Sequence, residues 1–134
     1  MICDYILTSP LKIPYTSKKE FSLNMNTYRN THFQCLNKVK IKYKEEMRDQ
    51  IMELPVFNHI DCIEYAMYYP DKRKRDGMNV ASVISKFFLD ALTEYGIIED
   101  DNVNIVRSEV WKFGGVDNKS PRCEIKITGD VREL

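Results

Sequence analysis

The chain has 134 residues, of which 43% are hydrophobic and 30% are charged, and its 20 basic and 20 acidic side chains cancel to a formal net charge of zero. This composition is typical of a folded globular domain and excludes a disordered tail or a collagen-like fibre. No run approaches the roughly 20 apolar residues of a membrane-spanning helix, and the balanced charge excludes binding to nucleic acid by bulk positive charge alone. We therefore expect a single domain over residues 1–134 that has no membrane partner.

The first half of the chain predicts one strand and one helix. Residues 2–8 are apolar and rich in strand formers, and the Ser-Pro pair after them ends the strand. Residues 10–34 contain Pro, Ser and Asn and are interpreted as a loop. The next stretch has both a strand period and a helical period, but its helix formers favour a helix over about 38–53 that ends before Pro55.

The middle of the chain gives the clearest pattern. Residues 59–69 are apolar on both faces, which is typical of a central strand. Apolar residues from Val80 to Leu92 recur at the spacing of one helix face. Asn79 is expected to cap the start of this helix and Gly96 its end.

The last third predicts two strands, 103–113 and 122–128, with a loop rich in Gly, Asn and Ser between them. Residues 122–128 alternate in polarity, as expected for a strand with one buried face. The two strands are expected to pair as a C-terminal antiparallel hairpin. The predicted fold is therefore α+β, with two main helices packed on a mixed sheet.

The cysteines and histidines do not predict a metal site. The four cysteines, at positions 3, 35, 62 and 123, are far apart in the sequence, and only two histidines are present. Dispersed cysteines are typical of reduced thiols, and the first ten residues lack the charge pattern of a secretion signal. We expect a cytoplasmic location.

Charged residues flank the second predicted helix. A basic run, 72–75, leads into Asp76 before the helix, and Glu99, Asp100 and Asp101 follow it. If strand 103–113 lies beside strand 59–69, these carboxylates lie at neighbouring ends of elements and would need a cation such as Mg²⁺ to offset their repulsion. The alternative is a charged turn and an acidic loop that are both simply solvated.

Three motifs in this region resemble the RusA family of Holliday-junction resolvases. They are R-D-x-x-N around Asp76, S-K-F-F-L-D-A-L around Lys86, and G-x-x-x-D-D-N ending at Asn102. The similarity covers about residues 66–127, and the segment 23–33 is a weaker match to the family's N-terminal region.

The resemblance implies a magnesium-dependent endonuclease, with manganese as a possible substitute, that resolves four-way DNA junctions in recombination and repair. It implies a homodimer acting on branched DNA in the cytoplasm of a bacterium, or encoded by a phage and acting in that of its host. By motif position, Asp76, Lys86 and Asp101 match the family's catalytic residues, and Asp76 and Asp101 would bind the metal. The resemblance also implies that the basic side chains contact DNA phosphates, namely Lys72, Arg73, Lys74 and Arg75, with Arg29 and His32 upstream.

The sequence departs from the family at Met78, where the family has a second aspartate. A thioether is a poor ligand for Mg²⁺, which prefers oxygen. Asn79 or Asp100 could replace the missing ligand. Otherwise the protein is a catalytically impaired relative that binds branched DNA or a host protein without cutting.

Simpler roles remain open for several of these residues. Asp76 could only initiate a turn, Lys86 could pair with Asp90, and Met78 could pack against the following helix as a hydrophobic staple. Trp111 is interpreted as a packing residue rather than a DNA contact.

Overall fold

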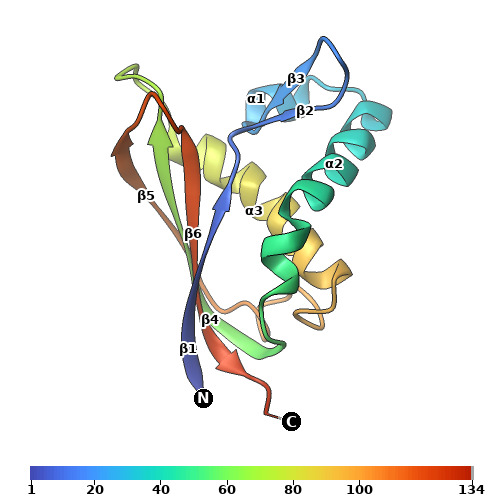
Figure 1. Cartoon of the computed structure of the whole chain (residues 1–134), viewed down its shortest axis with the longest axis vertical. Coiled ribbons are helices and arrows are strands. Elements are labelled where there is room, and N and C mark those ends of the chain that lie inside the picture. The colour runs from blue at the N-terminus through green and yellow to red at the C-terminus, as the bar shows by residue number, and fades with distance from the viewer. Residues whose placement is uncertain (134) are drawn as a thin grey trace.

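The computed structural model describes residues 1–133, which form a four-stranded mixed sheet, a two-stranded sheet and three helices (Figure 1). The large sheet contains β1 (Ile2–Ser9), β4 (Phe57–Tyr69), β5 (Glu109–Val116) and β6 (Arg122–Val131), in the spatial order β1-β6-β4-β5. The small sheet pairs β2 (Lys12–Pro14) with β3 (Glu20–Ser22), and the helices are α1 (Met25–Arg29), α2 (Phe33–Met52) and α3 (Gly77–Glu94). The predicted α+β class with a mixed sheet is confirmed.

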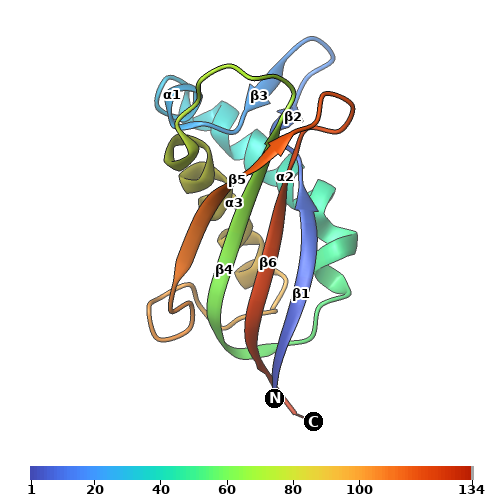
Figure 2. The same cartoon turned by 90° about the vertical axis from the view of Figure 1, so that its left-hand side faces the viewer.

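The helices cover one face of the large sheet and leave the other face open (Figures 1 and 2). The alternation in β6 fits this arrangement, because Cys123, Ile125 and Ile127 are buried while Lys126 is exposed. β4 is the central strand, as predicted, and pairs antiparallel with β6 and parallel with β5.

Both long helices form where the sequence predicts them. α2 buries Val39, Tyr43, Met47 and Ile51 at the helical spacing. The predicted helix is therefore confirmed, and the alternation at the start of this segment does not form a strand. α3 buries the predicted apolar face, and its Phe87 ring packs near the rings of Phe21, Tyr28 and Tyr43. The fully buried hydrophobic residues form one cluster between the helices and the sheet.

The ends of α3 only partly match the prediction. Gly96 follows the last turn with a φ of 77°, a left-handed conformation that glycine adopts without a steric penalty. The start lies earlier than predicted, because Asp76 rather than Asn79 is the N-cap residue. Met78 is therefore inside the first turn and 54% exposed, so the predicted hydrophobic staple is wrong.

The two C-terminal strands follow each other in opposite directions, as predicted for a hairpin, but they do not pair with each other. β5 and β6 are joined by the short loop 117–121, and β4 lies between them and pairs with both. Among residues 1–133, no strand lies on the outer side of β5, which forms one edge of the sheet.

The segment 10–34 is more structured than a loop. It contains β2, β3, α1 and the start of α2. α1 packs against α3 and β2 packs against α2, and Phe21 and Leu23 contribute buried side chains to the core. No helix among residues 1–133 is long and apolar enough to cross a lipid bilayer.

Candidate nucleic-acid interface

The predicted carboxylate cluster does not form within one chain. Asp76 precedes α3 and Asp101 follows it, and the 18-residue helix between them is about 27 Å long. β5 does lie beside β4, but the two strands are parallel, so the segment that leaves β4 and the segment that enters β5 lie at opposite ends of the sheet. In both views the loop 70–76 is at the top and the loop 96–108 is at the bottom (Figures 1 and 2).

At the upper end, Asp76 and Asn79 have structural partners. The backbone N–H of Met78 donates a hydrogen bond to Asp76 Oδ1 at 3.1 Å, which satisfies a free donor in the first turn of α3. The backbone N–H of Met25 donates to Asn79 Oδ1 at 3.2 Å, so this oxygen ties the start of α1 to α3. The Asn79 oxygen that was predicted as a replacement metal ligand therefore has a structural partner within this chain.

At the lower end, Asp100 is used within its own loop. It accepts hydrogen bonds from the backbone N–H of Asp101 at 2.8 Å and from Asn102 Nδ2 at 2.9 Å. The bond from the Asp101 N–H lowers the pKa of the Asp100 carboxyl below its ordinary value. Across residues 1–133, no group of three or more His, Cys, Asp or Glu side chains could hold a metal ion.

The basic run is built around Asp71. Arg75 Nη1 lies 2.8 Å from one oxygen of Asp71, and Arg73 Nη2 lies 3.0 Å from the other. The hydrogen bonds from Arg75, then from Arg73, hold the pKa of the Asp71 carboxyl far below its usual value. Arg75 also stacks over the Tyr69 ring at 4.7 Å, so it is mainly a structural residue of this loop.

Lys72 and Lys74 are the free cations of the same loop. Both are exposed, and neither forms an ion pair with any of residues 1–133. Lys74 lines a groove of about 530 Å³ between the loop 70–76 and the small sheet. Lys12 and Arg73 line it as well, and we call it the basic groove.

Arg29 and His32 lie close to this end of the molecule. Arg29 is the last residue of α1, which packs against α3, and it is exposed. His32 is the N-cap of α2, where its Nδ1 accepts a hydrogen bond from the backbone N–H of Gln34 at 3.2 Å. Its ring also packs on Phe33 at 4.7 Å, which gives His32 a structural role.

Two exposed aromatic residues adjoin the basic loop. Trp111 and Phe113 on the edge strand β5 are 42% and 63% exposed, and they line a cavity of about 270 Å³ together with Arg73 and Arg75. The Trp111 ring lies so close to Gly77 that a Cβ there would come within 2.3 Å of it. Trp111 therefore packs on the start of α3, as predicted, and its partial exposure beside the basic loop is a feature that the sequence did not indicate.

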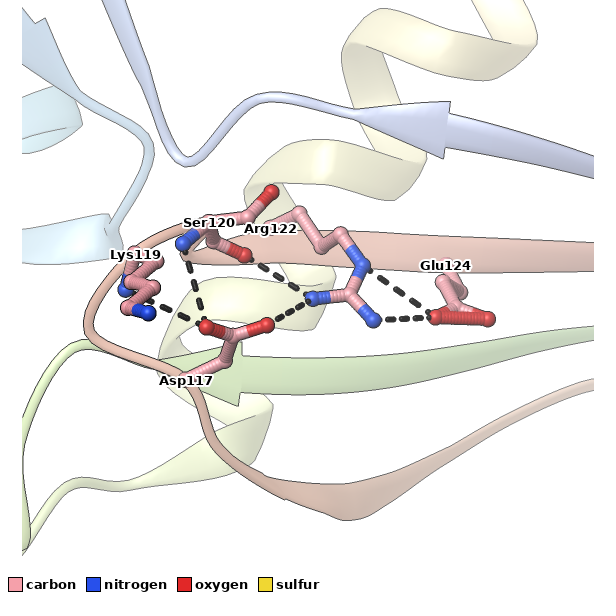
Figure 3. A network of polar contacts seen from close by, with 5 residues as sticks. All are labelled: Asp117, Lys119, Ser120, Arg122 and Glu124. Carbon is pink, nitrogen blue, oxygen red and sulfur yellow. Dashed lines mark hydrogen bonds and ion pairs between the residues drawn. The ribbon is translucent and has the colours of Figure 1, made fainter.

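An arginine on β6 fixes the neighbouring loop 117–121 (Figure 3). Arg122 pairs with Asp117 at 3.0 Å and with Glu124 at 2.8 Å, and its guanidinium stacks on the Tyr68 ring at 4.2 Å. Asp117 also accepts backbone hydrogen bonds from Lys119 and Ser120. These contacts hold the loop that connects β5 and β6, the two strands on either side of β4.

Lys86 lies apart from both groups of carboxylates. It follows Asp76 by ten residues, about 15 Å along α3, and its Nζ is 6.0 Å from the centre of the Tyr28 ring. The predicted pair of Lys86 with Asp90 is not among the ion pairs of residues 1–133. Lys86 instead lines a groove between α3 and β5, in which Glu109 is a hydrogen-bond acceptor.

No protein-family model matches this chain, and a search of curated proteins finds no match. The resemblance to the RusA family therefore depends on the sequence motifs alone and stays a prediction.

Proposed function

We propose that this protein is a RusA-like protein that binds branched DNA through the end of the molecule formed by the basic groove and the loop 70–76, and that a single chain does not cut it. The observation that carries the proposal is the separation of Asp76 from Asp101 by the length of α3. A metal-dependent nuclease needs its carboxylates on one cation, and here the basic residues gather around only one of the two acidic positions.

The charge distribution supports binding without a metal. Lys72, Lys74 and Lys12 are exposed at the same end, and phosphate contacts from such side chains give affinity that does not depend on base sequence. Trp111 and Phe113 add exposed aromatic surface beside them, which suits the unstacked bases of a branch point.

The resolvase activity is the second candidate, and it requires two copies. In a homodimer, Asp76 of one copy and Asp101 of the other could share a cation that neither copy holds alone. The free exposure of Asp101 at the lower end of the molecule favours this arrangement.

A nicking assay separates the two candidates. We expect the protein to shift a four-way DNA junction in a gel at low salt and to leave it uncut with Mg²⁺ or Mn²⁺. The same result is expected for Asp101→Asn, which serves as the matched control. Metal-dependent cutting that Asp101→Asn abolishes would overturn the proposal in favour of the resolvase.

If cutting occurs, mixed dimers show where the site lies. Chains with Asp76→Asn and chains with Asp101→Asn would each be inactive alone. Mixing them would restore one intact centre only if each centre takes one carboxylate from each copy. Absence of any junction binding at low salt would end both candidates.

A further inference from the structure

The groove between α3 and β5 has polar groups that the DNA-binding loop does not use. Its volume is about 370 Å³, and Trp111 and Met78 line it as apolar walls. Ser82 and Glu109 line it as polar groups, and Lys86 adds a cation. The groove adjoins the cavity below the basic loop, because Trp111 lines both.

Glu109 is held in one orientation by two hydroxyl groups. The Tyr65 hydroxyl and the Ser85 hydroxyl both donate to Oε2 at 2.6 Å. Tyr65 is 1% exposed, so this bond anchors the carboxylate from inside the core. No group among residues 1–133 donates to the other oxygen, Oε1, which therefore keeps its capacity to accept.

Ser82 is the second unused polar group. Its Oγ is buried and has no hydrogen-bond partner among residues 1–133. A buried hydroxyl without a partner is costly, by about 1–3 kcal/mol, unless something else bonds it. A ligand in this groove would supply that partner.

These groups define the ligand by its chemistry. A planar ring would stack on Trp111, an amino group on the ring would donate to Glu109, and a polar ring atom would bond Ser82. A phosphate on a sugar attached to the ring would meet Lys86. A nucleotide whose base carries an exocyclic amino group has all of these features.

We propose that the α3–β5 groove binds one unstacked, amino-bearing nucleobase, namely cytosine, adenine or guanine, with Trp111 as the stacking surface and Glu109 as the hydrogen-bond acceptor. This inference deepens the proposed DNA binding and rests on it for its biological setting. The branch point of a junction is where a base can leave its stack at low cost. Thymine is disfavoured because it has no exocyclic amino group and offers the carboxylate only its ring N3–H.

The chain provides its own probe for the test. Trp111 is the single tryptophan of the sequence, so the intrinsic fluorescence of the protein reports on this groove. We expect deoxycytidine 5′-monophosphate to quench this fluorescence and to bind about tenfold more tightly than thymidine 5′-monophosphate, as a charge-assisted hydrogen bond predicts. Equal binding of the two nucleotides, or no quenching by either, would overturn the inference.

Three variants assign the roles. Glu109→Gln should bring the two nucleotides within about twofold of each other, because a neutral amide both donates and accepts. Glu64→Gln, on the neighbouring strand with its side chain paired to Lys112, is the matched control and should keep the preference. Lys86→Met should weaken deoxycytidine 5′-monophosphate but leave deoxycytidine unchanged.

The Ser82→Ala variant separates an effect on ligand binding from an effect on protein stability. Because the hydroxyl has no partner in the part of the chain that the structure describes, its removal should not lower the melting temperature, yet it should weaken nucleotide binding. Unchanged nucleotide binding in both Ser82→Ala and Glu109→Gln would overturn the site.

The same measurements distinguish this inference from the proposed function. If the junction binds in a salt-dependent manner but the fluorescence shows no base preference, only the nucleobase site is wrong. If the nucleotides bind with the expected preference but the junction does not bind, the site is supported and the proposed function is wrong.

Discussion

The sequence suggests two roles for Asp76, a metal ligand and a turn residue, and the structure shows it capping a helix. It matches a metal ligand by motif position, but its side chain is the N-cap of α3. An N-cap needs a short side chain with an acceptor oxygen, whereas a metal ligand needs a negative charge. The two roles therefore respond differently to substitution.

We predict that Asp76→Ala lowers the free energy of unfolding by about 1 kcal/mol and that Asp76→Asn lowers it by much less, because asparagine is an equally good cap. Urea denaturation with and without Mg²⁺ measures both effects. A stabilisation of the wild type by Mg²⁺ that Asp76→Asn removes would instead show that this carboxylate binds metal.

Asp71 gives the basic loop a dependence on pH. Its folded-state pKa is lowered by Arg75 and then Arg73, so the ionised carboxylate stabilises the folded loop. A lowered pKa contributes stability that is fully present above the unfolded-state value of about 4 and is lost as the pH falls.

We predict that the wild type is more stable than Asp71→Asn at neutral pH and that this difference narrows steadily below about pH 4. Urea denaturation of both proteins across this range measures it. The difference is expected to be small, because the pair is exposed to solvent. A difference that grows as the pH falls would contradict the ion pairs around Asp71.

At the scale of single elements, α3 and β4 were predictable because their signals are local. The apolar spacing from Val80 to Leu92 fixes a helix face, and residues 59–69 are too apolar for an edge strand. The small elements β2, β3 and α1 were missed because three to five residues are too few to show a period.

The pairing of strands was not predictable in the same way. Alternation in residues 122–128 shows which face is buried, but it does not identify the neighbouring strand. β6 fits against β4 and β1, and β5 reaches its place by the parallel crossover through α3. Short loops usually join paired strands, and the loop 117–121 is an exception.

The contact between α3 and β5 can be tested at Gly77. A Cβ at this position would lie 2.3 Å from the Trp111 ring, so the ring must move. We predict that Gly77→Ala shifts the tryptophan emission to longer wavelength as the ring becomes more exposed, and lowers the free energy of unfolding by about 1 kcal/mol through overpacking.

Gly96→Ala is the matched control for this substitution. A Cβ at Gly96 would meet no atom of residues 1–133 within 4 Å beyond its chain neighbours, but the φ of 77° is strained for alanine. It should lower stability by a similar amount, about 1 kcal/mol, without changing the emission. An unchanged emission in Gly77→Ala would show that Trp111 does not pack on the start of α3.

At the scale of the whole molecule, the parallel arrangement of β4 and β5 decides the functional interpretation. The sequence places an acidic residue before α3 and three after it, and nothing in that spacing shows which end of the sheet each group occupies. The length of the helix does argue against a shared site, because the two ends of an 18-residue helix are about 27 Å apart. The sequence predicts a basic loop at the surface. It does not show that Arg73 and Arg75 pair with Asp71 while the two lysines do not, because these pairs depend on side-chain geometry.

The exposed cations of the molecule are distributed over different surfaces. The free cations Lys72 and Lys74 lie at the upper end, and other exposed cations, such as Arg48 near the end of α2 and Arg107 before β5, lie elsewhere. If only the upper end contacts DNA, then removing charge there should change the salt dependence of binding, whereas removing it elsewhere should not.

We predict that Lys72→Ala with Lys74→Ala weakens binding to a four-way junction and flattens the plot of log affinity against log salt by about 0.9 for each DNA phosphate that the variant no longer neutralises. Arg48→Ala with Arg107→Ala removes the same charge and should leave the slope unchanged. Fluorescence anisotropy of a labelled junction over a salt series measures both.

Arg75 is left intact in this design, since its bond to Asp71 and its stacking on Tyr69 make its removal a test of loop structure as well. Equal slopes for the wild type and the Lys72/Lys74 variant would show that the basic loop faces away from DNA, and a flattened slope in the Arg48/Arg107 variant would place the DNA on another surface.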